Sequence, residues 1–427
     1  MTFALFVTPV ALLLLGFPIF IVLLTAVSVA LVFFMHVPLA ALHQNLFASI
    51  NATALLAVPF FIYAGELMGR GSVAQRLVDF VQSGVGSMRG SLGVTAVGTS
   101  AIFGAISGAS AATVATIGKV MVPAMRRAGY PETFTAGLIT AVGAIDVIIP
   151  PSIPMIVYGA AAEESVARLY AAGVLPGLMI AGMLAVYVFW RARHERFGAG
   201  EPFDFRRFLH ATGRSLWALG APVIILGGIY GGVFSPTEAA AVACVYAAFV
   251  TAFVFRELGA RDIIEAAAAT VLFTGQILII IACAGVFAWL LTVNQVPAAV
   301  TTWLQALNVA PWMLLLAINI LLLLVGCFLD PLSAILLLSP LLVPIVKAAG
   351  VDPVHFGIVV TVNLAIGLFH PPFGINIFVA QSVLGLKLEV IYRGIVPFLV
   401  IYLIALALIT YVPDISLIGM RYLLARG

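Results

Sequence analysis

The residues best suited to chemistry stand at two short polar interruptions within long apolar runs. The first runs from Ser107 to Ser110, SGAS, and the second is Gly326–Ser333, GCFLDPLS, which contains Asp330. Hydroxyl and carboxylate oxygens suit a hard cation such as Na⁺, although the small serines could instead allow close helix packing. A carboxylate at membrane depth is costly, so Asp330 is a functional candidate. A role for Asp330 as a helix N-cap is an open alternative.

A second pair of interruptions contains paired prolines, Pro150-Pro151 within Ile148–Pro154 and Pro371-Pro372 within Gly367–Gly374. Non-helical backbone at membrane depth survives only when it is buried in protein or lines a watery cavity. The N-termini of half-helices favour a carboxylate, and their C-terminal carbonyl groups favour a cation. The four interruptions therefore predict neighbouring anion and cation sites, which coupled symport requires.

Five further polar residues lie in the apolar runs. Asp146 precedes the first proline pair, and ion coupling and structural support of the break are equal alternatives for it. Asn363 either coordinates an ion or satisfies freed backbone groups, and we expect His370 to be structural. We expect Lys119 to extend toward the cytoplasmic face, and Glu66 to be a structural or interface carboxylate.

The composition places these residues in a membrane. The chain is 63% hydrophobic and 9% charged, with a mean hydropathy of +1.20, whereas soluble domains carry about 25% charged residues. The net charge of +3 is too small and too scattered to indicate nucleic-acid binding. Three dispersed cysteines lack metal or disulfide spacing and are expected to be small core residues.

Hydropathy predicts the order of the spans. The run at 4–34 has no basic residue before it, which favours a retained membrane helix over a cleaved signal peptide. A less hydrophobic connection, His36 to Asn51, separates it from the next span, and segments 72–90 and 295–310 resemble interfacial arms. The remaining spans are predicted at 52–69, 170–190, 216–234, 238–255, 263–293 and 390–412, with interrupted regions at 98–154 and 311–384.

Charge predicts the orientation. The loop 191–214 has more arginines than acidic residues, which places it in the cytoplasm. The base of the first hairpin is also basic, with Arg89, Arg126 and Arg127, whereas the base of the second has Lys347 and Asp352. The hairpins should therefore open to opposite faces of the membrane. The orientation of the termini stays open.

An internal repeat predicts the architecture. An offset of 221 residues places Pro150-Pro151 on Pro371-Pro372, and it also aligns Val122-Pro123 with Val343-Pro344. Together with the opposite charge of the hairpin bases, this predicts an all-α polytopic fold of two inverted repeats, each with a re-entrant hairpin and a discontinuous helix. The predicted divisions are 1–90 (scaffold and first arm), 91–168 (transport half 1), 169–310 (scaffold, loop and second arm), 311–388 (transport half 2) and 389–427 (C-terminal helix and tail).

The sequence lacks the motifs of ATP-driven motors, zinc proteases and hydrolases with a nucleophile elbow. Gly118-Lys119 lacks the upstream glycine and following hydroxyl of a phosphate-binding loop. His194-Glu195 has no second histidine at the spacing of zinc proteases, and the chain contains no nucleophile elbow. We therefore expect no catalytic residue and no cofactor, and either an ion gradient as the source of energy or passive transport.

Over essentially its whole length the chain resembles the large membrane subunit of TRAP (tripartite ATP-independent periplasmic) transporters. The resemblance rests, in this order, on PFFIYAGELM, GAISGASAATVATIG, VPAMRRAGY, IPPSIPMIVYG, FSPTEAAA, GCFLDPLSAI and HPPFGINIF. It implies a sodium-driven elevator of the ion transporter superfamily type in a bacterial inner membrane, importing an organic acid such as a C4-dicarboxylate, sialic acid or a sugar acid. A small four-helix membrane subunit and a periplasmic substrate-binding protein are the implied partners.

The resemblance carries over to the interruptions residue by residue. Ser107, Gly108 and Ser110 match the family's first tip, where Ala109 departs from the hydroxyl or small residue that we expect in many members. Asp330 matches the acidic residue of the second tip. The candidate substrate-binding residues are Ser107, Ser110, Ser152, Asp330 and Pro371, and the candidate sodium-binding residues are Ser107, Gly108, Gly143, Pro150, Gly326, Asp330, Asn363, Gly367 and Pro372.

Two other functions stay open. A stand-alone divalent-anion/sodium symporter would share inverted hairpins but need no binding protein, and an ion channel or structural membrane subunit could also contain broken helices. An intramembrane enzyme is least favoured. The sequence leaves open which organic acid is carried, the sodium stoichiometry and the oligomeric state.

Overall fold

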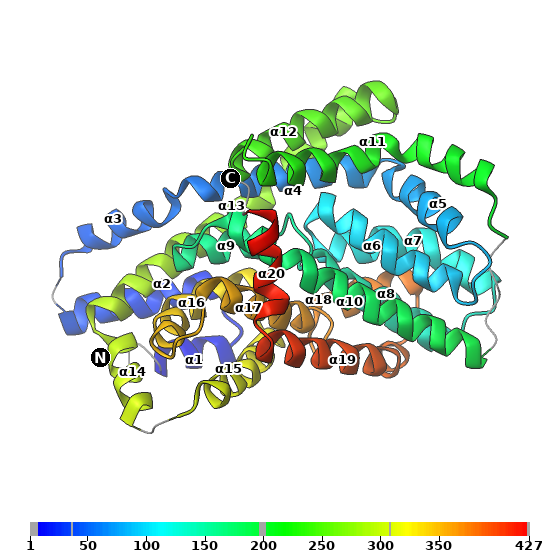
Figure 1. Cartoon of the computed structure of the whole chain (residues 1–427). Helices are drawn as coiled ribbons and strands as arrows, with labels where there is room; N and C mark the ends of the chain where they lie inside the picture. The colour runs from blue at the N-terminus through cyan, green and yellow to red at the C-terminus, as the bar shows by residue number, and fades with distance from the viewer. Residues whose placement is uncertain (1–6, 36, 196–201, 307–308, 425–427) are drawn as a thin grey trace.

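The computed structural model describes residues 7–35, 37–195, 202–306 and 309–424, and this part of the chain is helical throughout, without a strand (Figure 1). Six of its helices are long and apolar enough to span a bilayer. The predicted all-helical, multi-pass class is therefore confirmed. These six are α10 (Val166–Glu195), α11 (Phe205–Tyr230), α12 (Pro236–Phe249) with its π-helical extension η4 (Val250–Val254), α13 (Ala260–Val293), α16 (Pro331–Ala348) and α19 (Leu388–Tyr411).

The N-terminal region differs from the prediction. The span expected at 4–34 is divided into α1 (Thr8–Leu14), α2 (Ile19–Ala30) and a π-helical turn η2 (Leu31–Met35), and residues 4–6 lie outside the described part. The division follows from Gly16, whose φ of 81° ends one helix, and Pro18, which caps the next.

The connection expected from His36 to Asn51 is also different, because it contains a helix, α3 (Leu39–Ile50). A short turn, η3 (Thr53–Leu56), joins α3 to α4 (Ala57–Arg70), and the two form a single segment bent by 60°. The polar residues of α3 lower its mean hydropathy but do not interrupt the helix. The hydropathy pattern alone therefore predicted a connection where the structure has a helix.

The two expected arms are short helices, α5 (Val73–Val85) and α14 (Val296–Ala306). The loop expected at 191–214 is largely helical where it is described, because α10 continues to Glu195 and α11 begins at Phe205, capped by the Asp204 carboxylate. Residues 196–201 of this loop lie outside the described part. The chain ends in α20 (Asp414–Leu423), which packs on α10.

The interrupted regions are two hairpins and two broken helices. The first hairpin consists of α6 (Ser91–Ser107) and α7 (Ser110–Arg127), and the first broken helix of α8 (Glu132–Asp146) and α9 (Ile153–Ala162). The second set consists of α15 (Pro311–Gly326) and α16, followed by α17 (Pro353–Gly367) and α18 (Ile375–Leu384). The bounds of α7 and α8 recur in α16 and α17 at the same offset of 221 residues.

The two sets of helices interlock. The return arm of each hairpin packs against the second half of the other broken helix, α7 on α18 and α16 on α9. In Figure 1, α11 and α12 run along the upper edge, and α6, α7 and α8 lie below them and above α19.

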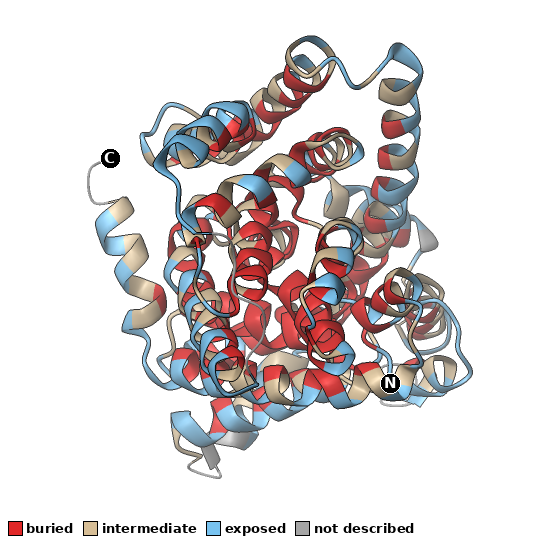
Figure 2. Cartoon of the chain, turned by 90° about the vertical axis from the view of Figure 1, so that its right-hand side faces the viewer, coloured by how far each residue is buried: buried red, intermediate tan, exposed pale blue. Residues whose placement is uncertain are grey.

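The core sits in the first halves of the broken helices. All of Phe134–Asp146 in α8 and all of Val354–Gly367 in α17 are buried, and Figure 2 shows the buried residues gathered in the central helices. The outer helices expose large apolar side chains, such as Val186 at 68% and Phe253 at 70%. Apolar surface on this scale is typical of contact with lipid rather than water.

Candidate functional site

The four interruptions meet at one cavity of about 260 Å³. Each return half-helix begins there: α7 with Ser110, α9 with Ile153, α16 with Pro331 and α18 with Ile375. Four helix N-termini, each carrying a partial positive charge, therefore converge on one space. The other lining residues are Gly108, Ala109, Ala111, Val147, Pro154, Asp330, Leu332 and Leu368, and from α13 Phe273, Gln276, Ile277 and Ile280.

The first tip turns at Gly108. This residue has a φ of 61°, which glycine adopts without strain, and its amide donates to the Gly104 carbonyl at 3.1 Å, ending α6. Ser107, one residue earlier, is buried and does not line the cavity. Its carbonyl faces Gly65 of α4 so closely that a Cβ at Gly65 would lie 2.7 Å away. At Gly65 the tip therefore approaches α4 through the Ser107 backbone.

Ser110 is held by a residue that sequence reasoning missed. The Asn376 amide donates from Nδ2 to the Ser110 hydroxyl at 2.8 Å and to the Thr140 carbonyl at 3.3 Å, and all three groups are buried. The only local signal is an asparagine within the apolar run INIF. Gly143 leaves room for this contact, because a Cβ there would lie 3.1 Å from Asn376 Nδ2 and 3.0 Å from the Ser110 carbonyl oxygen.

Asp146 lies behind the first tip, at the C-terminal end of α8, and is fully buried. One carboxylate oxygen accepts the hydroxyl of Thr113, and Oδ1 has no hydrogen-bond partner among the described residues. A Cβ at Gly104 would lie 2.7 Å from Asp146 Cα, so the ends of α6 and α8 are in direct contact. The backbone amides of Gly108 and Ala109 also face this carboxylate, and a buried carboxylate oxygen that lacks a well-formed hydrogen bond is a fitting ligand for a cation.

Asp330 forms the N-cap of α16. Its carboxylate accepts the Ser333 amide at 2.9 Å and the Ser333 hydroxyl at 2.7 Å, and the residue is exposed at the cavity. The capping alternative is thus confirmed, and the same carboxylate also lines the cavity. The equivalent position at the offset of 221 is Ala109, which caps α7 without a side-chain bond, so the two tips differ in charge.

The second tip approaches the second break through glycines. A Cβ at Gly367 would lie 2.5 Å from the Gly326 carbonyl oxygen, so α15 and α17 end against each other as α6 and α8 do. Nearby, His370 Nδ1 contacts Cys327 Sγ at 3.1 Å and also the carbonyl oxygen of Pro371. The Pro372 carbonyl accepts the Tyr392 hydroxyl at 3.0 Å.

Asn363 takes part in a buried polar chain. Its Nδ2 donates to Asn319 Oδ1 at 2.8 Å, and Asn319 Nδ2 donates to the Thr410 hydroxyl at 3.1 Å, which joins α17, α15 and α19. Its Oδ1 is buried without a partner among the described residues. Asn363 therefore supports the fold and still has one free acceptor.

Ser152 is buried, and its hydroxyl accepts the Met155 amide and donates to the Val147 carbonyl, which caps α9. Neither it nor Pro150, Pro371 or Pro372 lines the cavity. Both proline pairs have cis peptide bonds. Of the predicted site residues, the cavity brings together Gly108, Ser110 and Asp330.

The α13 wall was not predicted. Among its lining residues Gln276 alone is polar, and its side chain is exposed. Gln276 lies in the middle of a 34-residue helix without a local break, so only the tertiary structure shows that it faces the tips. Among the described residues, no group of three or more histidine, cysteine or acidic side chains could hold a metal ion.

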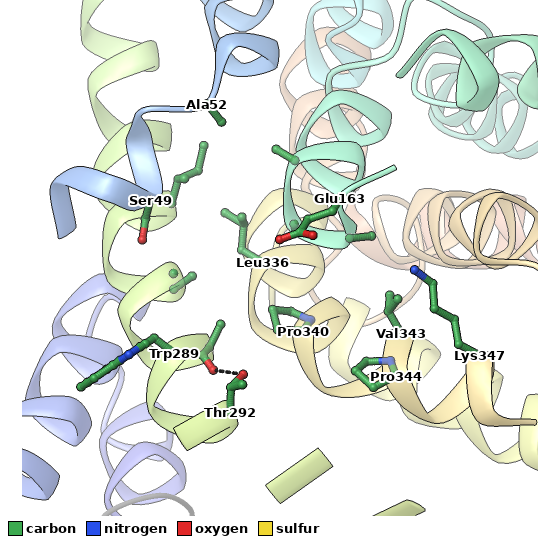
Figure 3. Close-up of a pocket in the computed structure, with 17 residues that line it drawn as sticks. Ser49, Ala52, Glu163, Trp289, Thr292, Leu336, Pro340, Val343, Pro344 and Lys347 are labelled. Carbon is green, nitrogen blue, oxygen red and sulfur yellow. Dashed lines mark hydrogen bonds between the residues drawn. The ribbon is translucent and has the colours of Figure 1, made fainter. Parts of the chain in front are cut away.

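A larger cavity of about 470 Å³ lies further along α13, between α3 and α13 on one side and α9 and α16 on the other (Figure 3). Lys347 at its edge forms an ion pair with Glu164 at 3.1 Å. Its other lining is mainly apolar, and its α13 residues, Ile281 to Thr292, continue those of the smaller cavity. The interruptions do not reach it, so we place the candidate site at the smaller cavity.

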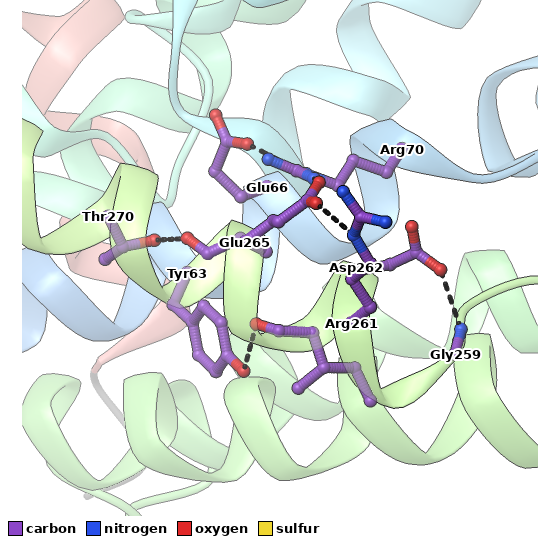
Figure 4. A network of polar contacts seen from close by, with 10 residues as sticks. Tyr63, Glu66, Arg70, Gly259, Arg261, Asp262, Glu265 and Thr270 are labelled. Carbon is purple, nitrogen blue, oxygen red and sulfur yellow. Dashed lines mark hydrogen bonds and ion pairs between the residues drawn. The ribbon is translucent and has the colours of Figure 1, made fainter.

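Glu66 lies away from both cavities. It pairs with Arg70 at 3.5 Å, Arg70 contacts Glu265 at 3.4 Å, and Glu265 pairs with Arg261 at 2.9 Å (Figure 4). These partly exposed pairs join α4 to the start of α13 and contribute about 0–1 kcal/mol each. The network places Glu66 at an interface between helices.

Comparisons with known proteins show which family the chain resembles. The family model described as "Tripartite ATP-independent periplasmic transporter, DctM component" matches residues 6–415. The chain is 43% identical over 373 residues to the C4-dicarboxylate TRAP transporter large permease protein DctM of Pseudomonas aeruginosa, covering 87% of each chain. It is 39% identical to the isethionate TRAP transporter permease protein DctMQ of Oleidesulfovibrio alaskensis, covering 94% of this chain and 64% of that longer one.

A solved structure shares the fold. The Alcanivorax borkumensis YdaH transporter superposes with a TM-score of 0.66 at 14% identity, covering 98% of this chain and 99% of the other. At this identity the likeness concerns the fold alone.

Proposed function

This chain belongs to the DctM family, the large permease components of TRAP transporters, and from this premise we propose that it imports an organic acid by sodium symport. The relatives are permease subunits and not enzymes. The proposed substrate class is a small organic acid of the C4-dicarboxylate, sialic acid or sugar acid type, delivered by a periplasmic binding protein. The proposed location is the inner membrane of a bacterium.

The observation that carries the proposal is the convergence of four helix N-termini, those of α7, α9, α16 and α18, on one cavity. Backbone amides and helix dipoles at such ends attract an anion without a buried lysine or arginine. The negative charge of the Asp330 carboxylate counteracts the partial positive charge of these helix ends and would repel a substrate carboxylate. A sodium ion bound nearby would relieve that repulsion, which would make substrate binding depend on sodium.

The matching C-terminal ends support sodium binding. Helices α6 and α8 end against each other beside Gly104 and Asp146, and α15 and α17 end against each other at Gly326 and Gly367. The turns that follow already bond some of the last carbonyl oxygens, such as that of Gly104, and the others have no further helical turn to bond. We therefore assign one sodium site to each pair, with Asp146 Oδ1 as an additional ligand in the first.

The recurrence of helix bounds at 221 residues, together with the opposite charge of the hairpin bases, supports two inverted repeats. In an elevator, the interlocked hairpins and broken helices would move as one body along α4 and α13. The close contact of the Ser107 backbone with Gly65 fits such a sliding surface, because glycine has no side chain at this point.

The family premise also implies two partners, a small membrane subunit and a soluble binding protein. The isethionate relative carries the longer name DctMQ, and this chain covers 64% of it.

The test is uptake of a labelled organic-acid panel into proteoliposomes that contain this chain and its small subunit. The panel would be run with and without the binding protein, under inward Na⁺ or K⁺ gradients. Uptake that requires both Na⁺ and the binding protein is the expected result. Sodium-driven uptake without that protein would favour a stand-alone symporter, and flux that does not saturate with substrate would favour a channel.

A further inference from the structure

A second polar cavity, of about 250 Å³, lies between the N-terminal halves of α5 and α11 and shares no residue with the candidate substrate cavity. Its lining is Arg76, Asp79, Arg207, His210, Ala211, Arg214 and Ser215. We infer that this cavity binds the phosphate group of an anionic phospholipid of the cytoplasmic leaflet. The inference depends on the orientation of the chain in the membrane and not on the transported substrate.

The charge of the cavity favours an anion. Three guanidinium groups line it against one carboxylate, Asp79, which already accepts an amide hydrogen bond from Gln75 at 2.8 Å. Arg76 is paired with Glu257 at 3.1 Å and lies over the Phe255 ring. Arg214, by contrast, makes no ion pair or hydrogen bond with any residue in the described part of the chain. A positive group therefore remains available to a phosphate.

The cavity is held in shape by contacts between its two helices. The Ser215 hydroxyl donates to the Arg76 carbonyl at 2.7 Å, and the rings of Phe80 and Phe208 stack at 5.8 Å. The two helices therefore fix the positions from which the basic side chains extend. A preformed basic pocket between helices at the cytoplasmic face suits a lipid head group.

The surroundings favour a lipid over a soluble anion. Trp217 follows His210 by seven residues, close to two turns, and so lies on the same face of α11. The ring centroids of Trp217 and Phe249 lie 6.3 Å apart, and those of Phe249 and Phe253 lie 5.8 Å apart. All three are exposed, by 42, 47 and 70%. A basic pocket continued by an exposed aromatic ladder matches a phosphate followed by acyl chains.

The lipid would act on the first arm. Helix α5 packs on α11 and also on α6 of the first hairpin. A lipid that bridges α5 and α11 would therefore hold α5, the first arm, in place against that hairpin. A soluble phosphate ion would neutralise the cavity but would not cover the aromatic ladder.

The experiment is lipid retention by the purified chain with its small subunit, measured by native mass spectrometry after delipidation. Phosphatidylglycerol, phosphatidylcholine and inorganic phosphate are added in separate arms. We expect phosphatidylglycerol to be retained over phosphatidylcholine. Arg214→Gln should weaken retention roughly fivefold, because a basic residue near an anionic surface contributes about that factor. The matched control is Arg261→Gln, whose side chain is 91% exposed and lies outside the cavity.

Three results would overturn the inference. These are equal retention of the two lipids, equal weakening by Arg214→Gln and Arg261→Gln, and full displacement of phosphatidylglycerol by inorganic phosphate at millimolar concentration. Should Arg214→Gln fail to fold, the lipid preference of the unaltered chain decides, measured as the difference in thermal stability between phosphatidylglycerol and phosphatidylcholine.

Discussion

Ser110, the first residue of α7, and Asn376, the second residue of α18, are joined by a buried side-chain hydrogen bond of 2.8 Å across 266 positions of the sequence. The bond connects the first hairpin tip to the second broken helix beside the candidate substrate cavity, which Ser110 lines. Because Ser110 begins the return arm of the first hairpin and Asn376 lies in the second broken helix, the bond joins the two sets of interrupted helices.

Ser110→Ala should destabilise the protein by about 1–3 kcal/mol, because it removes one of the two acceptors of the buried Asn376 amide. Asn376→Ala should cost a similar amount, and the double variant little more than either. Thermal unfolding of all three would measure the coupling, expected at about 0.5–3 kcal/mol. Additive effects would show that the two residues act separately.

Asp330 both caps α16 and lines the cavity, and two substitutions separate these roles. Asp330→Asn keeps a good N-cap and removes the charge, so we expect near-normal thermal stability and loss of sodium-driven uptake. Asp330→Ala also removes the cap, at about 1 kcal/mol, and should abolish uptake while the protein still folds and inserts. Normal uptake by either variant would exclude a role for the charge.

The sequence predicts the interruptions because glycine, proline and serine act locally on the backbone. Two adjacent prolines, as in Pro150-Pro151 and Pro371-Pro372, remove two successive backbone donors and restrict the residue before each, which favours a break at that point. Their common offset aligns α8 with α17 without any knowledge of packing. The same local signals, Gly16 and Pro18, divide the first span, although its hydropathy gives a single run.

The parts of the site that the sequence does not predict depend on contacts between distant segments. Asn376 follows the second break as an isolated polar residue, and nothing near it in the sequence indicates Ser110 as its partner. Gln276 is equally isolated in α13. Periodicity places such a residue on a helix but does not show which face meets the tips, because that depends on how the whole bundle packs.

Gly367→Ala tests the proposed second sodium site. The added Cβ would lie 2.5 Å from the Gly326 carbonyl oxygen and must push α15 and α17 apart, at a cost of about 1–3 kcal/mol. We expect a raised sodium concentration for half-maximal uptake. Gly182→Ala is the control, because its Cβ would meet nothing within 4 Å and should stabilise α10 by about 0.5–1 kcal/mol. An unchanged sodium dependence in Gly367→Ala would place the ion elsewhere.

Gln276→Leu tests the α13 wall. The side chain is exposed in the cavity, so its loss should leave thermal stability unchanged. If its amide donates to the substrate carboxylate, the lost bond is worth about 1.5–3 kcal/mol, which raises the half-saturating substrate concentration roughly tenfold or more. The sodium dependence should stay the same. A variant with unaltered substrate saturation would show that α13 contributes only shape.

Glu257 lies in the loop between η4 and α13, where its carboxylate accepts the Ser72 amide at 2.7 Å and pairs with Arg76 at 3.1 Å. Burial raises the pKa of this carboxyl, but the bonds from Ser72 and Arg76 lower it by more, so the pKa lies below its ordinary value. A depressed pKa in the folded state means that the stabilisation is present above the unfolded pKa, about 4.3, and is lost as the pH falls through the folded value.

Glu257→Gln should therefore unfold at a lower temperature than the unaltered chain at pH 7, and the two should converge as the pH falls below about 4. Thermal unfolding in detergent between pH 7 and pH 3 measures this. Glu389→Gln is the control, because Glu389 is exposed in the first turn of α19 and should show a smaller difference at pH 7. Parallel unfolding curves for Glu257→Gln and the unaltered chain across the whole pH range would contradict the role of this ion pair in holding α5 beside η4.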